Sequence, residues 1–288
     1  MNLYTIDTEL FKLDGGAMFG VVPKSIWNKL NPADENNMCT WAMRCLLIED
    51  GNRLILVDNG IGNKQDAKFF SHYYLHGNDT LDRSLQKHGF SKDDITDVFL
   101  THLHFDHCGG SVEREGDKLV PAFKHATYWS NERHWDWATK PNDREKASFL
   151  KENILPIQES GQLKFIASPA DSIVDNRLGE VTFTENISVR FACGHTDMMM
   201  LPQIRYKDKT IIYAADLMPS AAHLPVPYVM AYDMFPLTTI NERKAFLKEA
   251  VENDIILFYE HDPVHECSTL QMTEKGVRVK ETFKLSEI

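Results

Sequence analysis

The stretch Thr101-His102-Leu103-His104-Phe105-Asp106-His107 places three imidazoles and one carboxylate within a few positions of one another. His102, His104 and Asp106 alternate by two, whereas His107 breaks the alternation. Side chains in a strand point to opposite faces in turn, so a strand could not direct all four to one point. A loop that follows a strand and turns into a helix could do so, and we expect that arrangement.

The residues on either side of this stretch favour a metal-binding loop. The apolar run Ile95–Leu100 precedes it and is typical of a buried strand, and Gly109-Gly110 follows it, which lets the backbone wrap closely. Neutral imidazole and carboxylate are the ligands that Zn²⁺ and similar divalent ions prefer. The alternative is a solvated loop of unrelated histidines, and the density of ligands argues against it.

Five apolar, strand-like runs each end at a polar residue that is able to bind a metal. They are Arg53–Val57 before Asp58, Ile95–Leu100 before the histidine cluster, Ile187–Ala192 before Cys193-Gly194-His195, Thr210–Ala215 before Asp216, and Ile255–Tyr259 before Glu260-His261-Asp262. One such residue at one strand end is adequately explained as a turn former. Recurrence at five strand ends predicts a site that a rigid sheet positions on its loops.

The composition is that of an ordinary globular enzyme. The chain has 288 residues, of which 43% are hydrophobic and 25% charged, with a formal net charge of −11. Nucleic-acid binding needs a basic face, so we expect no nucleic-acid partner. We expect a single domain over residues 1–288, with helices near 80–89 and 240–253 and a helical excursion around 125–162 that covers one face of the site. A surface helix pair with core tryptophans is the alternative for that excursion.

The cysteines and the N-terminus indicate the compartment. The five cysteines are odd in number and lack C-x-x-C spacing, which favours a reducing environment. Cys108 and Cys193 flank candidate ligands, and we expect them to pack as small buried residues instead of binding metal. No signal peptide or membrane-spanning run is visible, so we expect a cytoplasmic protein without a membrane partner.

Together with Gly194-His195-Thr196, Asp216 and His261, the histidine cluster resembles the metal-binding series of the metallo-β-lactamase superfamily in order and in position at strand ends. The resemblance implies an α+β fold, a four-layer αββα sandwich with a dinuclear metal site at one edge of the sheets. It implies two divalent ions, which we expect to be zinc, with manganese, iron and cobalt as alternatives. One ion takes His102, His104 and His195, the other takes Asp106, His107 and His261, and Asp216 bridges both.

The charges in this implied site agree with hydrolysis. Two divalent ions bring four positive charges together, which Asp106 and Asp216 partly offset, and we assign both a catalytic role. A water between such ions becomes a hydroxide nucleophile near neutral pH, suited to an ester-like bond. Redox members of the flavodiiron type carry Glu where this chain has His104, so oxygen reduction is not expected. Thiolesterases of the glyoxalase II type share the ligands.

Segments outside the ligands resemble one bacterial branch of the superfamily. Leu13–Trp27, Asp216–His223 and Pro227–Asp233 are similar to N-acyl-homoserine lactonases and the methyl-parathion-hydrolase type. For the first segment a turn packed on the core is one interpretation. The functional interpretation is an apolar wall that faces the metals and contacts an acyl chain or an aromatic leaving group, formed by Met18, Phe19 and Val21.

One departure concerns the residue after the bridging aspartate. Lactonases of this branch carry a Tyr three residues after it, where this chain has Pro219, and we expect His223 as a catalytic substitute or Tyr232 in substrate binding. Our hypothesis is a hydrolase that opens N-acyl-homoserine lactones or related small-molecule lactones and esters. The alternatives are a phosphotriesterase or arylesterase of the same fold and a metal-binding sensor without turnover. A homodimer fits the resemblance.

Overall fold

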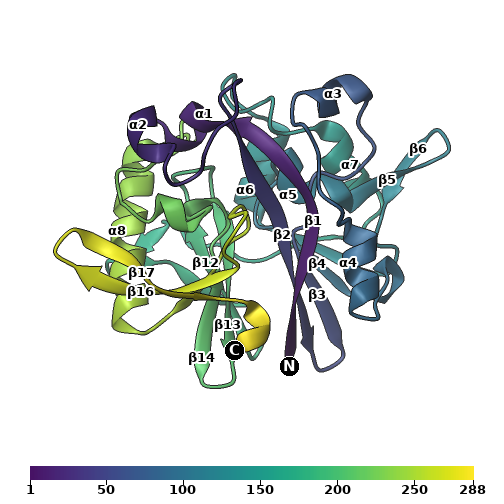
Figure 1. Cartoon of the computed structure of the whole chain (residues 1–288). Coiled ribbons are helices and arrows are strands. Elements are labelled where there is room, and N and C mark those ends of the chain that lie inside the picture. The colour runs from purple at the N-terminus through teal and green to yellow at the C-terminus, as the bar shows by residue number, and fades with distance from the viewer. The chain divides into compact units, whose positions relative to one another are not determined.

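The structure, a computed structural model, describes all 288 residues (Figure 1). The chain divides into two compact units. The first comprises Met1–Phe11 and Ala42–Ala167, and the second comprises Lys12–Trp41 and Ser168–Ile288. Strands β1 (Asn2–Asp14) and β2 (Met38–Asp50) each begin in one unit and end in the other. The single domain over 1–288 stays a prediction.

The first unit is built on a six-stranded sheet of order β1-β2-β3-β4-β7-β8, in which the last three pairings are parallel. Its further elements are β3 (Arg53–Val57), α3 (Ala67–Ser71), α4 (Leu81–Lys87), η1 (Lys92–Asp94), β4 (Asp97–Phe99), α5 (Phe105–Cys108), η2 (Gly109–Ser111), β5 (Val112–Glu115), β6 (Lys118–Pro121), β7 (Thr127–Ser130), α6 (Glu132–Thr139), α7 (Lys151–Glu159) and β8 (Leu163–Phe165). The region 125–162 contains two helices, and it begins with β7, a strand of the sheet that the prediction of a helical excursion did not include.

The second unit is built on a seven-stranded sheet of order β11-β12-β13-β14-β15-β16-β17, antiparallel except for the pair β14–β15. Its elements are α1 (Gly15–Phe19), α2 (Lys24–Trp27), β9 (Ile173–Val174), β10 (Arg177–Leu178), β11 (Glu180–Thr182), β12 (Ile187–Ala192), β13 (Met199–Tyr206), β14 (Lys209–Tyr213), η3 (Ala215–Leu217), η4 (Ala221–His223), α8 (Pro236–Glu252), β15 (Ile256–Phe258), β16 (Cys267–Thr273), β17 (Gly276–Phe283) and η5 (Leu285–Glu287). Helix α8 packs against this sheet and contacts β10, β16 and β17 (Figure 1).

All five strands predicted from the apolar runs are present, as β3, β4, β12, β14 and β15. The helices predicted near 80–89 and 240–253 are α4 and α8. Helix α4 follows Thr80, whose hydroxyl caps the first turn, and the chain turns away after the helix at Gly89, which has a φ of 84°.

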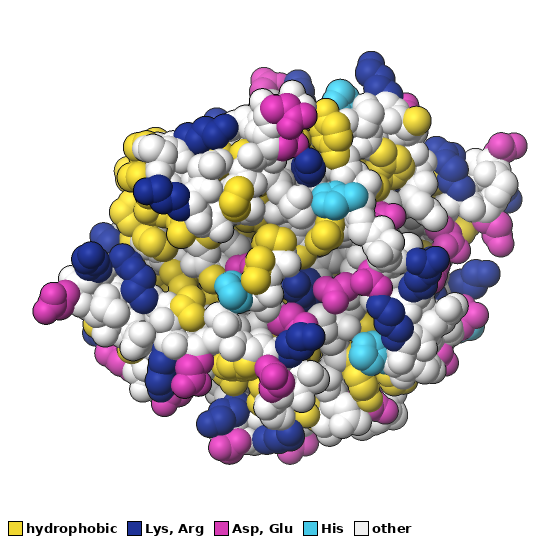
Figure 2. Space-filling view, viewed as in Figure 1, with side chains coloured by type: hydrophobic (Ala, Val, Ile, Leu, Met, Phe, Trp, Pro, Cys, Tyr) yellow, Lys and Arg dark blue, Asp and Glu magenta, His cyan; other side chains and the backbone are white.

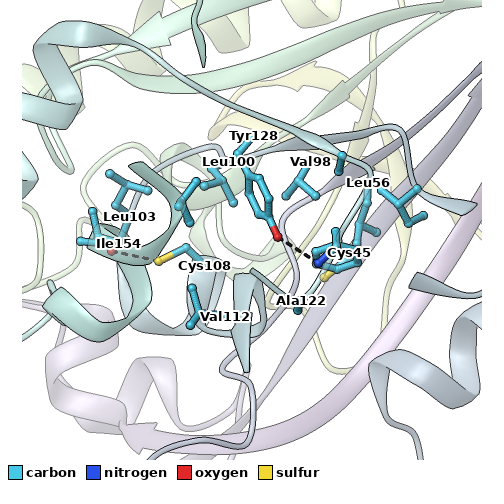
Figure 3. Packing of buried hydrophobic residues seen from close by; sticks show 14 of the residues in the cluster. Cys45, Leu56, Val98, Leu100, Leu103, Cys108, Val112, Ala122, Tyr128 and Ile154 are labelled. Carbon is cyan, nitrogen blue, oxygen red and sulfur yellow. Dashed lines mark hydrogen bonds between the residues drawn. The ribbon is translucent and has the colours of Figure 1, made fainter. Parts of the chain in front are cut away.

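The core of the first unit includes apolar residues of the segment that carries the histidine cluster, Leu103 and Cys108 (Figure 3). Leu103 and Cys108, from that loop and from α5, are buried in the same hydrophobic cluster as Leu100 and Tyr128. The Cys108 thiol donates to the carbonyl oxygen of Leu103 at 3.3 Å, and burial raises its pKa to about 12. The thiol is therefore neutral and packs as expected, and each fully buried apolar side chain here contributes about 2 kcal/mol.

Two surface properties bear on the expected partners. No helix is both long enough and apolar enough to cross a bilayer. On the face that Figure 2 shows, acidic and basic side chains are interspersed, without a broad basic area. The absence of nucleic-acid and membrane partners stays a prediction.

Candidate metal centre

The candidate ligands of the first unit leave its sheet at one edge. Strands β3 and β4 are parallel and pair Val57 with Phe99, so the residues that follow each strand emerge side by side. Asp58 therefore meets Thr101, which donates to its carboxylate from the backbone N–H (2.8 Å) and from the hydroxyl (2.7 Å). Asp58 has a positive φ of 55°, a conformation that Asp tolerates better than most residues.

The hydrogen-bond network determines which nitrogen of His102 carries the proton. The Thr101 hydroxyl gives its only proton to Asp58, so it accepts at 3.1 Å from Nδ1–H of His102. Nε2 of His102 consequently presents a lone pair. The ring is fully buried, which holds this orientation in place.

His104 is oriented in the same manner by Glu145. Its Nε2–H donates to the Glu145 carboxylate at 3.0 Å, and Glu145 also accepts from the indole N–H of Trp137 at 2.6 Å. Nδ1 of His104 then presents a lone pair and lies 3.1 Å from Nε2 of His102. Two lone pairs at this distance repel each other unless a proton or a cation lies between them, which is the chemistry of a metal site.

His107 and Asp106 complete the group. Nδ1–H of His107 donates to Asp58 at 3.2 Å, and its Nε2 lies 3.7 Å from a carboxylate oxygen of Asp106. All four candidate ligands of this unit are at most 8% exposed. Burial of this many polar groups is costly unless a bound cation compensates for it, so the group fits a metal ion.

The backbone of residues 59–62 contacts the ligand loop and its continuation at residues 107–110. The amide of Asn59 donates to the His107 carbonyl at 2.9 Å, and the amide of Gly110 donates to the Gly60 carbonyl at 3.0 Å. Gly62, at a φ of 70°, approaches Gly109 so closely that a Cβ would overlap its carbonyl group. The ligand loop is therefore held by its backbone as well as by its rings.

The candidate ligands of the second unit also leave a sheet at one edge. Strands β14 and β15 are parallel and pair Tyr213 with Phe258, and Asp216 and His261 each follow three residues later. Their side chains meet, with Nε2 of His261 at 3.2 Å from one carboxylate oxygen of Asp216. Ala215 has a φ of 40°, which is strained for a residue with a Cβ and is typical of functional sites.

His195 contacts the other carboxylate oxygen of Asp216. Its Nε2 lies 3.0 Å from Asp216, and its Nδ1 lies 2.9 Å from a carboxylate oxygen of Asp233. Burial lowers the pKa of His195, but the two aspartates outweigh burial and raise it to about 10. The pair of carboxylates thus creates a strong preference for positive charge at this position, which a divalent ion satisfies.

His223 is buried, and both of its ring nitrogens have partners. Its ring is fully buried and stacked on Phe19, with Nδ1 at 2.7 Å from the Ser220 hydroxyl and Nε2 at 3.0 Å from the Met18 carbonyl oxygen. Burial lowers its pKa to about 3, so the ring is neutral. Both nitrogens are engaged in holding neighbouring groups, and the catalytic role stays a prediction that this arrangement does not support.

The predicted substrate residues do not share one surface. Met18 and Phe19 are almost completely buried, whereas Val21 is 91% exposed and Tyr232 is 39% exposed. The helix α1 ends between Phe19 and Val21, where Gly20 takes a φ of 56° and turns the chain. Met18 and Phe19 pack as core, and a substrate-binding role for the four residues stays a prediction.

Asp58, Glu145 and Asp233 each contact the ring of a candidate ligand. The sequence prediction gave Glu145 and Asp233 no role, and it named Asp58 only as a polar residue at a strand end that is able to bind a metal. Asp58 follows a predicted strand, which was the available signal. Asp233 and Glu145 lie in a loop and a helix-rich region, where spacing indicates no partner.

Comparisons with known proteins agree with the fold and the residue types. The family model described as the metallo-beta-lactamase superfamily matches residues 44–261. A probable metal-dependent hydrolase from Staphylococcus aureus is 23% identical, with a TM-score of 0.85, and the match covers 98% of this chain and 96% of that one. The α+β metallo-β-lactamase fold predicted from the sequence is confirmed.

Two further solved structures share the fold. AidC, a dizinc quorum-quenching lactonase in complex with a product, is 23% identical with a TM-score of 0.77, covering 98% of this chain and 95% of that one. A mutant of AiiA from B. thuringiensis, with N-decanoyl-L-homoserine bound at the active site, is 19% identical with a TM-score of 0.67, covering 91% of this chain and 93% of that one. At these identities the similarity shows the fold alone.

Proposed function

Because the chain belongs to the metallo-β-lactamase superfamily, we propose that it is a dinuclear metal-dependent hydrolase that opens N-acyl-homoserine lactones or related small-molecule lactones and esters. The observation that carries the metal part is the pair of imidazole lone pairs, on His102 and His104, that face each other at 3.1 Å. The lactonase part is supported by the similarity to AidC and AiiA and by the resemblance of the N-terminal segment to that branch.

In this proposal both ligand groups serve one pair of ions, which the family model supports because it spans both groups. The proposed ligands are His102, His104 and His195 for one ion and Asp106, His107 and His261 for the other, with Asp216 shared. We propose zinc as the metal, because zinc prefers neutral imidazole and carboxylate ligands and these side chains supply both. When bound, two such ions supply a nucleophile from water at neutral pH and polarise the carbonyl of the substrate.

The side chains of the chain itself prepare this chemistry. Asp58, Glu145 and Asp233 accept the back-side protons of the rings of His107, His104 and His195. This fixes each tautomer and makes the imidazole a better ligand. Asp106 and Asp216 supply the negative charge that keeps two cations close together, and burial of the group excludes bulk water, which strengthens every charge interaction.

The substrate class is tested with a panel of acyl-homoserine lactones, aryl esters and phosphotriesters, using enzyme loaded with zinc. We expect the highest kcat/KM with lactones. Strong triester turnover without lactone turnover would favour the phosphotriesterase alternative, and preference for aryl esters would favour the arylesterase.

Pro219 motivates a second candidate, a metal-binding sensor without turnover. It stands three residues after Asp216, where a tyrosine donor is expected, and it cannot donate a hydrogen bond to a substrate. Zinc-dependent turnover of any member of the panel would exclude this candidate. Binding of a lactone without turnover would support it.

Light scattering of the same preparation would test the proposed homodimer.

A further inference from the structure

We propose that Glu242 and Arg243, neighbours on helix α8, are positioning residues for the two ligand-bearing loops of the second unit. Glu242 fixes the loop that carries His195, and Arg243 fixes the segment that follows Asp216. The inference rests on the proposed function, because it assigns both residues a role in metal affinity. Neither residue is among the proposed metal ligands.

Glu242 binds the backbone immediately before His195. Its two carboxylate oxygens accept from the amides of Cys193 (2.7 Å) and Gly194 (3.0 Å), and one of them also accepts from the Ser172 hydroxyl (2.6 Å). The side chain is fully buried. Burial raises its pKa, and these three hydrogen bonds oppose that rise. A carboxylate that spans two successive amides leaves the next residue little freedom of position.

The first turn of α8 holds the same loop by close packing. A Cβ on Gly194 would overlap Thr239, so the loop lies directly on the helix and requires glycine there. The amides of Phe235 and Met234 donate to the carbonyls of Gly194 (2.8 Å) and His195 (3.1 Å). The position of His195 therefore follows the position of α8.

Arg243 binds the backbone that follows Asp216. Its Nε donates to the Leu217 carbonyl at 2.8 Å, and one terminal nitrogen donates to the carbonyls of Tyr228 (2.6 Å) and His223 (3.3 Å). The guanidinium is fully buried. Burial lowers its pKa, and the negative charges of Asp233 and Asp216 oppose that shift.

Glu242 and Arg243 are adjacent on helix α8, so together they hold the two ligand-bearing loops at a fixed position relative to each other. Helix α8 is 17 residues long, and it presents an acceptor to one loop and a planar set of donors to the other. Nε2 of His195 lies 3.0 Å from a carboxylate oxygen of Asp216, so a small displacement of either loop changes this distance. Partners outside the ligands typically affect metal affinity or activity by about 10–100-fold.

Glu249 provides a matched control on the same helix. It lies two turns after Glu242, is 7% exposed, and accepts from Arg190 at 2.9 Å. None of its hydrogen bonds involves the loops of His195 or Asp216. Its substitution removes a buried carboxylate from α8 without touching the candidate metal ligands.

The test compares Glu242→Gln, Arg243→Lys and Glu249→Gln in the full chain, by zinc affinity in chelator competition and by thermal unfolding. Glutamine keeps the shape of Glu242 but turns an amide NH₂ toward one backbone N–H. We expect zinc affinity to fall about 10–100-fold in Glu242→Gln and in Arg243→Lys, and to be unchanged in Glu249→Gln. Excess zinc should restore kcat in the first two variants, with KM unchanged.

A different pattern would overturn the assignment. If Glu242→Gln and Glu249→Gln lower thermal stability alike and both keep wild-type zinc affinity, Glu242 is a structural residue only. If Glu242→Gln does not fold, Arg243→Lys decides by the same comparison. A wild-type chain that binds no zinc would overturn the proposed function and this assignment with it, whereas normal wild-type binding with unchanged variants overturns this assignment alone.

Discussion

The two units of this chain hold their candidate ligands in different ways. In the first unit, four ligands come from one short loop, and carboxylates contact their rings directly, as Asp58 does for His107 and Glu145 does for His104. In the second unit, three ligands come from three separate strand ends, and a helix binds the backbone of their loops through Glu242 and Arg243. Asp233 likewise contacts the ring of His195, so ring orientation is common to both units. The difference is that the dispersed ligands of the second unit also need their separate loops placed relative to one another, which Glu242 and Arg243 do from one helix.

The same contrast explains where each unit is intolerant of change. The ligand loop of the first unit packs on the 59–64 segment through glycines, with Lys64 buried and donating to the Gly109 carbonyl. In the second unit the close glycine approach at a ligand loop is that of Gly194 on α8. Positive φ angles occur in both, at Asp58, which contacts the His107 ring, and at Ala215, which directly precedes Asp216.

The largest effect is expected from Asp216→Asn in the second unit. The substitution removes one of the two ligand charges that hold the metals while keeping the shape. Metal affinity should fall, at the second site most of all, and lactone turnover should drop by orders of magnitude. Circular dichroism should still show a folded chain, because apolar strands hold the sheet. Asn is a good turn former, so a variant with normal metal content and turnover would make Asp216 a turn residue only.

The next largest effect is expected from Asp58→Asn in the first unit. Asn accepts a positive φ as readily as Asp, so the backbone should persist. Its amide NH₂ would face either the Thr101 backbone N–H or both the Thr101 hydroxyl and His107, and in each case a donor meets a donor. Zinc affinity should fall about 10–100-fold. Asp97→Asn is the control, because Asp97 binds Arg53 and Trp129 at the far end of β4. If the two variants bind zinc equally well, Asp58 does not act by orienting the ring of His107.

The smallest effect is expected on stability, from Gly62→Ala. Gly62 has a φ of 70° and faces the Gly109 carbonyl, whereas Gly51 has a φ of 64° and open space around it. Both alanine variants carry left-handed strain of about 1–2 kcal/mol, and only Gly62→Ala adds an overlap, about 2 kcal/mol more. Urea unfolding measures both, and equal stabilities would show that the support segment is not tightly packed.

The sequence predicted the parts of the site that depend on neighbours along the chain. The spacing of His102 to His107 and the ends of β14 and β15 located candidate ligands in both units, because strand register carries Asp216 and His261 to one edge. It did not predict Glu145, Asp233 or Glu242. Their partners lie 38 to 49 residues away, and no local periodicity encodes such a contact.

The apolar segment after Asp14 illustrates the opposite difficulty. Its pattern indicated hydrophobic residues near the site, yet Met18 and Phe19 are buried in the second unit and Val21 is exposed. Met18 and Phe19 lie in the short helix α1, and the turn at Gly20 directs the chain away before Val21, so Val21 does not lie on the same surface. Hydrophobicity predicts that a side chain avoids water, but not whether core or substrate covers it.

The most direct test of the account is a zinc titration of metal-free protein, with turnover of an acyl-homoserine lactone measured at each addition. If the ligand groups of both units serve one dinuclear centre, bound zinc should reach two ions per chain, and turnover should rise until the second ion is bound. Turnover that is independent of zinc, or tight binding of no more than one ion with full activity, would contradict it.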